Sequence, residues 1–241
     1  MNTKVQFKCA LCPEIATTRE HLIKKTIVDE LMFDKPISKR PLKILRPRSC
    51  KIVQGSKSDA IKYPPNLCQS CNGHRSQPFD RAYHLFMNYV ISNEKNIFSS
   101  NRINLNVIKG LNKEHLFKYF IKSFCCMIDS TQHTKEKTLF SPLELVNAFH
   151  GGSYGKNLLI QFISRGSLKE HPMRKYILVS NPIYTQLPGN SFSFMYSESF
   201  GWFQIRYIYH KFHNKAEIRA CLPFFPNYWV GKSKEILVNT I

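Results

Sequence analysis

Residues 68–75 have the sequence CQSCNGHR, and residues 9–12 have the sequence CALC. Each stretch contains a Cys-x-x-Cys pair, a spacing that lets two sulfur atoms bind one metal ion. Two such pairs complete a closed tetrahedral site, so we expect one structural Zn2+. A thiol-redox function is the alternative, but that chemistry uses a single pair on a βαβ unit, and this chain has two pairs. The expected zinc ligands are Cys9, Cys12, Cys68 and Cys71.

An acid–histidine step, Glu20-His21, lies between the two pairs, and Asn72 follows the second pair directly. The ordered set of Cys-x-x-Cys, Glu-His and Cys-x-x-Cys-Asn resembles the HNH endonucleases of the His-Me finger (ββα-metal) superfamily. Within it, the set is most similar to the branch whose finger is held by four cysteines. The resemblance covers residues 7–80. The chain departs from the family pattern because 46 residues separate His21 from the second pair, and Asn66 is not assigned as the family's middle asparagine.

The resemblance implies metal-dependent hydrolysis of phosphodiester bonds. His21 would be the general base that takes a proton from water. Glu20 and Asn72 would supply oxygen ligands to one catalytic Mg2+ or Mn2+, while the zinc would only hold these segments in register. Read alone, Glu20-His21 is also compatible with an ordinary surface pair, and Asn72 with the N-cap of the next helix. His74 is an alternative metal ligand, or a phosphate donor beside Arg75.

The charge of the chain indicates a polyanionic partner. The sequence has 35 Lys and Arg against 16 Asp and Glu, a formal net charge of +19. Basic side chains that neutralise phosphates release counterions, so we expect nucleic acid, specifically double-stranded DNA. Residues 35–62 hold nine Lys or Arg against one acid, which predicts a basic arm or ribbon beside the active site; a solvated loop is the other interpretation. The expected nucleic-acid contacts are Arg40, Lys43, Arg46, Arg48, Lys51 and Arg75.

The fold class that the sequence predicts is α+β. An N-terminal zinc-bound ββα-metal (HNH) finger, with the basic insertion at residues 35–62, would form a nuclease domain over residues 1–100. Residues 101–241 would form a second domain, a helical segment followed by an antiparallel β-sheet, whose role the sequence leaves open. This second domain is the expected surface for a protein partner or for a homo-oligomer.

Periodicity predicts the main elements of the second half. Apolar residues at helical spacing indicate helices over residues 78–90 and 116–128, and the second of these has Lys118 and Lys122 on its other face. Cys125-Cys126 in the same helix would be buried thiols. The sequence at residues 141–144, SPLE, has the form of a capping box with proline at the first helical position. The expected strands are 158–163, 176–179, 191–196 and 202–209, with a turn at 199–201.

Several classes of protein are excluded by what the sequence lacks. No run of 18 apolar residues occurs, so we expect no membrane span, and the first residues lack the apolar region of a secretory signal. Cytoplasm is therefore the expected compartment, and the eight cysteines are expected as thiols. The sequence favours a metal-dependent HNH endonuclease acting on DNA. The alternatives are a non-catalytic zinc-binding nucleic-acid module and an RNA-directed nuclease.

Overall fold

The structure is a computed structural model of the 241-residue chain. It confirms the α+β class: helices precede an antiparallel sheet of five strands, and the N-terminal part contains a cluster of four cysteines. Among the described residues, no helix combines the length and the apolar character needed to cross a bilayer. The structure describes residues 7–32, 42–46, 49–53, 55–131, 141–152, 157–174, 176–187, 191–210 and 233–239.

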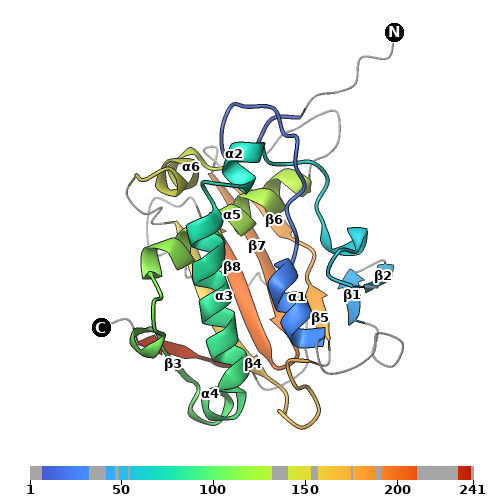
Figure 1. Ribbon diagram of the computed structural model, residues 1–241, viewed down its shortest axis with the longest axis vertical. Coiled ribbons are helices and arrows are strands. Elements are labelled where there is room, and N and C mark those ends of the chain that lie inside the picture. Colours follow the sequence, from blue (N-terminus) through green and yellow to red (C-terminus); the bar gives the residue numbers. More distant parts are fainter. Residues whose placement is uncertain are drawn as a thin grey trace.

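The helices gather in the first two thirds of the chain (Figure 1). Two of them are long and match the helical periodicity of the sequence, and 3-10 turns η2 and η3 accompany them. The helices are α1 (Lys25–Met32), α2 (Gln69–Asn72), α3 (Gln77–Ser92), α4 (Glu94–Ser100), α5 (Lys113–Ser130) and α6 (Leu143–Phe149); the turns are η2 (Asp59–Ile61) and η3 (Leu105–Val107).

The main sheet has the strand order β2-β1-β5-β7-β8-β4-β9, and β6 pairs with β7 off this path. Five strands in the order β5-β7-β8-β4-β9 pair antiparallel with their neighbours, as expected, whereas β1 pairs with β5 in parallel. A second, two-stranded sheet pairs β3 with β10. The strands are β1 (Leu42–Arg46), β2 (Ser49–Val53), β3 (Arg102–Asn104), β4 (Leu158–Arg165), β5 (Ile177–Val179), β6 (Ile183–Leu187), β7 (Ser191–Phe200), β8 (Phe203–His210), β9 (Ser233–Glu235) and β10 (Leu237–Asn239).

Aromatic side chains join the helices to the sheet. Figure 1 shows α1, α3 and α5 over one face of the strands. On α5, the ring of Phe124 meets Phe194 edge-on, with centroids 5.4 Å apart, and Phe120 meets Tyr207 at 5.9 Å. These contacts belong to one cluster of buried residues that also includes Leu11 in the first cysteine pair. One core thus spans the chain on both sides of residue 100.

The basic insertion forms regular structure where it is described. β1 and β2 make an antiparallel hairpin in which Leu42 pairs with Val53, and the pairing of β1 with β5 places this hairpin at an edge of the main sheet. The insertion therefore contains a ribbon, one of the two expected forms, and this ribbon extends the C-terminal sheet. Of the expected contact residues, Lys43, Arg46 and Lys51 lie on these two strands, and Arg40 and Arg48 lie outside the described residues.

Three local expectations were wrong. The helix after Ser141 begins one residue late, because Pro142 has ψ 129° and is itself the N-cap, without a side-chain capping bond. The turn between β7 and β8 falls at Gly201-Trp202, because Gly201 has φ 52° and an added Cβ would lie 2.2 Å from Pro172 O. Lys122 is 1% exposed and faces no solvent, because acidic groups from other elements meet it inside the protein.

Candidate metal centre and acid–histidine site

The four cysteines of the two Cys-x-x-Cys pairs come together, as the spacing predicts. Their sulfur atoms all lie within 4.8 Å of one another, and Cys12 Sγ is 3.6 Å from Cys68 Sγ. Two Zn–S bonds of about 2.3 Å in a tetrahedron span a similar distance, about 3.8 Å. Backbone amides point at the sulfurs: the N–H of Leu11 donates to Cys9 Sγ, and the N–H of Cys71 donates to Cys68 Sγ. The cluster therefore fits a structural Zn2+.

The pKa values of the cysteine thiols also favour a bound metal cation in the cluster. The hydrogen bond from Cys71 lowers the pKa of Cys9 to about 5, so one thiolate forms readily. Burial and the neighbouring sulfurs raise the pKa of Cys12 to about 11, and the bond to Cys9 raises that of Cys71. A dication is what allows four such thiols to lose their protons together. The four clustered cysteines, Cys125 and Cys126 are free thiols, as expected, and Cys125 and Cys126 are fully buried.

The acid–histidine step lies on one of two paired extended segments, and a helix follows the second segment. Residues 16–22 run antiparallel to residues 61–67, with bridges between Thr18 and Leu67 and between His21 and Lys62. The second segment leads directly into α2, which begins after Cys68. The chain therefore places two antiparallel segments and a helix around the cysteine cluster, although most of the basic insertion lies between the two segments.

Asn72 lies beside the acid–histidine step. Its Nδ2 donates to Thr18 Oγ1 at 3.0 Å and to the backbone oxygen of Arg19, the residue before Glu20, at 3.5 Å. Asn72 is the last residue of α2, and the next helix has Ser76 as its N-cap, so the interpretation of Asn72 as that cap is wrong. An added Cβ at Gly73, the C-cap, would lie 2.8 Å from the backbone oxygen of Gln69, so the chain leaves α2 at a position where a side chain would collide.

Asn66 has a part in the site that the sequence analysis did not assign. Its side-chain oxygen accepts the backbone N–H of Glu20 at 3.4 Å, and its backbone oxygen accepts the N–H of Ala10 in the first cysteine pair. The residue is fully buried. Asn66 thus braces the acid–histidine segment against the cysteine cluster. The sequence feature that could have identified this role is the position of Asn66 two residues before Cys68. Asparagine is also frequent in turns, so this position alone does not indicate a role in the site.

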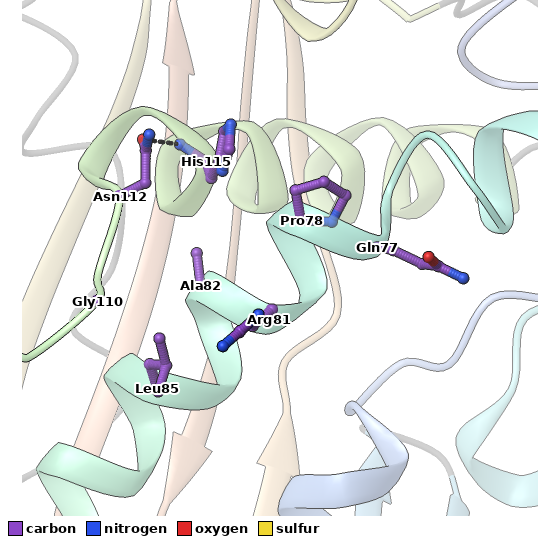
Figure 2. Close-up of a pocket in the computed structure, with 8 residues that line it drawn as sticks. All are labelled: Gln77, Pro78, Arg81, Ala82, Leu85, Gly110, Asn112 and His115. Atoms are coloured by element: carbon purple, nitrogen blue, oxygen red, sulfur yellow. Dashed lines mark hydrogen bonds between the residues drawn. The ribbon is translucent and has the colours of Figure 1, made fainter.

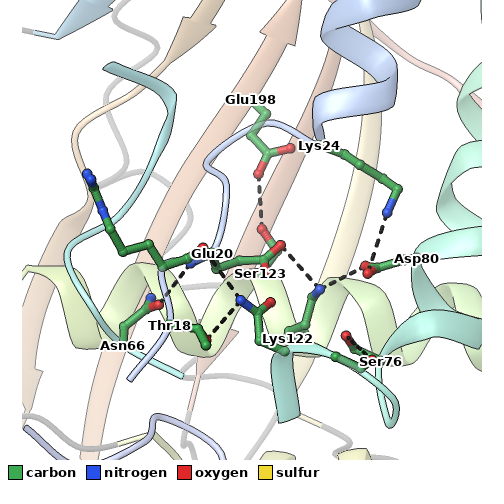
Figure 3. A network of polar contacts seen from close by, with 12 residues as sticks. Thr18, Glu20, Lys24, Asn66, Ser76, Asp80, Lys122, Ser123 and Glu198 are labelled. Atoms are coloured by element: carbon green, nitrogen blue, oxygen red, sulfur yellow. Dashed lines mark hydrogen bonds and ion pairs between the residues drawn. The ribbon is translucent and has the colours of Figure 1, made fainter. Parts of the chain in front are cut away.

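Glu20 is buried in an ion-pair network that joins residues 20–24 to α3 and α5 (Figure 3). Lys122 on α5 places its Nζ 3.2 Å from Glu20 Oε1 and 2.8 Å from Asp80 Oδ1 on α3. Lys24 Nζ lies 3.5 Å from the other oxygen of Asp80. Burial raises the pKa of Glu20, and the charge of Lys122 opposes that rise. The interpretation of Glu20-His21 as an exposed surface pair does not fit this burial.

Sequence reasoning missed Asp80, Lys24 and Lys122 because each reads as an ordinary surface residue until its partners in space are known. For a catalytic cation, the donor set is suitable: a carboxylate from Glu20 and an amide oxygen from Asn72 are the oxygen ligands that Mg2+ and Mn2+ accept. The Nδ2 of Asn72 bonds to Thr18 and to the backbone of Arg19, on the same segment that carries Glu20.

The imidazole of His21 is partly buried among lysine side chains. Burial lowers its pKa, and the positive charges of Lys62, Lys24, Lys122 and Lys25 lower it further. A histidine in this environment is neutral at pH 7 and has a ring nitrogen free to accept a proton. The same positive charges favour an anionic group nearby.

His74 and Arg75 both lie at the exposed surface after α2. Arg75 Nη1 contacts Nδ1 of His150 at 2.7 Å, and His150 Nε2 lies 2.6 Å from the backbone oxygen of Leu11. Since arginine only donates, His150 accepts at Nδ1 and donates from Nε2. His150, at the end of α6, therefore links Arg75 to the first cysteine pair. The structure brings His74 into no metal-ligating cluster of the described residues.

A groove of about 600 Å3 lies between the first turns of α3 and α5 (Figure 2). Arg81 and His115 face it, and Leu85 contributes to its apolar part. Asn112 at its rim caps α5, since its side-chain oxygen accepts the N–H of His115. None of the residues that the sequence analysis singled out as functional lines this groove. Its remaining lining residues are Gln77, Pro78, Ala82 and Gly110.

No protein-family model, curated protein or solved structure matches this chain. The resemblance to HNH endonucleases therefore rests on the motif residues themselves.

Proposed function

We propose that this chain is a metal-dependent endonuclease of the HNH type that hydrolyses phosphodiester bonds in DNA. One observation carries the proposal. Two antiparallel segments and a helix meet at the four-cysteine cluster, with Glu20-His21 on the first segment and the Asn72 side chain bonded to that same segment. A zinc-binding module that only contacts nucleic acid has no need for a buried acid, a neutral histidine and an amide at one point.

The residues have distinct roles in the proposed hydrolysis. Neutral His21 takes the proton of the attacking water. Glu20 and Asn72 would hold one Mg2+ or Mn2+, which would neutralise the charge of the phosphate and of the departing 3′ oxygen. Lys62 and Lys24, whose charges act on His21, favour the approach of a phosphate. The zinc site keeps α2 and the first segment together, and takes no part in the chemistry.

DNA is the proposed substrate because of charge and placement. The net charge of +19 and the basic residues of the β1–β2 hairpin favour a phosphate backbone. The hairpin lies at the edge of the main sheet, where a strand has only one neighbour. An RNA-directed nuclease would use the same site, so the substrate is an outcome of the test.

The test compares the parent with His21→Ala on supercoiled plasmid, single-stranded DNA and RNA, each with Mg2+, Mn2+ or EDTA. Loss of the base should reduce cleavage by about 10² to 10⁴, with nucleic-acid binding and zinc content unchanged. His84→Ala is the matched control, because that histidine lies on α3 and bonds to Asn88. Cleavage by His21→Ala at the parent's rate would make the proposed site wrong. Tight binding without cleavage of any substrate would favour the non-catalytic module.

A further inference from the structure

Lys122 is the most deeply buried cation of the ion-pair network. It lies in the middle of α5, and its side chain is 1% exposed. Its ammonium group contacts Glu20 Oε1 at 3.2 Å and Asp80 Oδ1 at 2.8 Å, and its Nζ also lies 5.5 Å from the ring centre of Tyr119. Glu20 belongs to the N-terminal segment, whereas α5 belongs to the part of the chain whose role could not be predicted from the sequence.

The network balances its charges. Glu20 and Asp80 contribute two negative charges, and Lys122 and Lys24 contribute two positive charges. Removing one partner of such a set leaves an uncompensated charge in a poorly solvated place, which is costly. The side chain of Glu20 is only 12% exposed, so water could solvate its carboxylate only weakly if the charge of Lys122 were removed. Glu20 would then change its direction to find another partner.

We propose that Lys122 is a positioning residue of the acid–histidine site: its ammonium group fixes the carboxylate of Glu20 beside His21. This inference rests on the proposed function. It gives α5 a specific role, because a residue some hundred positions away in the sequence completes a site whose other members lie in residues 18–72. Lys122 acts through Glu20 and touches no substrate, since it is buried. Asp80 holds the ammonium group from the other side.

The test measures kcat and KM for cleavage by Lys122→Met, Lys122→Arg and the matched control Lys118→Met. Lys118 lies one turn earlier on α5 and pairs with Glu114 on the same helix. We expect Lys122→Met to lower kcat by about 10- to 100-fold with KM for DNA little changed, the range typical of residues that orient a metal ligand. Lys122→Arg should restore most of kcat, because arginine keeps the charge. Lys118→Met should cleave like the parent.

Folding is checked by circular dichroism and zinc content, and all rates are taken well below each variant's melting temperature. If Lys122→Met does not fold, Asp80→Asn replaces it: this half-buried position keeps its oxygen acceptor, and a severalfold loss of kcat without a change in KM is expected. An active parent whose kcat is unaffected by Lys122→Met, or by Asp80→Asn in its place, overturns the inference alone. A parent that cleaves nothing overturns the proposed function and this inference with it.

Discussion

At the scale of single residues, the surroundings of His21 set the pH at which the proposed base works. Burial and the charges of nearby lysines lower its pKa below the ordinary value of 6.5. A base must be neutral to accept a proton, so kcat/KM should rise with pH through this lowered pKa. We therefore expect the midpoint of the acidic limb of the pH profile to lie below pH 6.5.

Replacing Lys62 tests the cause of this shift. Lys62→Met removes the strongest of the charges that act on His21, so the pKa of His21 should rise and the acidic limb should move to higher pH. Lys25→Met, whose charge acts more weakly, is the control and should move the limb less. The measurement is kcat/KM against pH for the three proteins. An acidic limb above 6.5 in the parent would contradict the expected environment of His21.

The sequence predicted which residues would gather but not which would bury charge. The spacing of the two pairs predicted the cluster of four cysteines, and the resemblance to HNH endonucleases predicted that Asn72 would lie near the acid–histidine segment, where it bonds to Thr18 and Arg19. It could not give Lys122, because a lysine at a polar helix position looks solvent-exposed until the acids that face it are known. Charge burial is a property of partners far apart in sequence, and periodicity along one helix carries no information about them.

At the scale of elements, strand β7 carries an acid inside the core. Glu198 is 2% exposed, and burial raises its pKa to about 8, although Ser123 donates a hydrogen bond to its Oε1. The predicted strand over residues 191–196 stopped short of this position. Alternation alone gives no reason for a carboxyl group to face the core, so this feature was accessible only from the structure.

This burial predicts how β7 responds to pH. The folded protein keeps the proton of Glu198 up to about pH 8, whereas the unfolded chain releases it near 4.5. The contribution of protonated Glu198 to the free energy of unfolding is therefore full below pH 4.5 and is lost as pH rises through 8. Glu198→Gln stays neutral and can still accept from Ser123. It should gain on the order of 3 kcal/mol in unfolding free energy over the parent at pH 9, and little at pH 4.

Urea unfolding of Glu198→Gln and the parent at both pH values is the measurement. Glu30→Gln, an exposed position on α1, is the control and should show no such dependence on pH. Equal stability of Glu198→Gln and the parent at pH 9 would mean that the Glu198 carboxylate is solvated in the folded protein.

At the scale of the whole molecule, α5 and α6 join the cysteine cluster to the sheet. α5 supplies Lys122 to Glu20 and Phe124 to the strands, and His150 at the end of α6 contacts the backbone of Leu11. The sequence offered no sign that the basic insertion would join the C-terminal sheet. β1 makes that connection by pairing with β5. Such a pairing depends on partners far apart in sequence, which local patterns do not reveal.

This continuous core predicts that a destabilising substitution between α5 and the sheet also destabilises the metal centre. Phe124→Ala removes a fully buried ring between α5 and the sheet, and should cost about 3–5 kcal/mol. Because one core spans both parts, zinc release into a coloured chelator and loss of sheet circular dichroism should share one urea midpoint in the parent. Both midpoints should fall together in Phe124→Ala. Val107→Ala, at a position 57% exposed, should leave both unchanged. Zinc release that keeps the parent's midpoint while the sheet of Phe124→Ala unfolds earlier would show two parts that unfold independently.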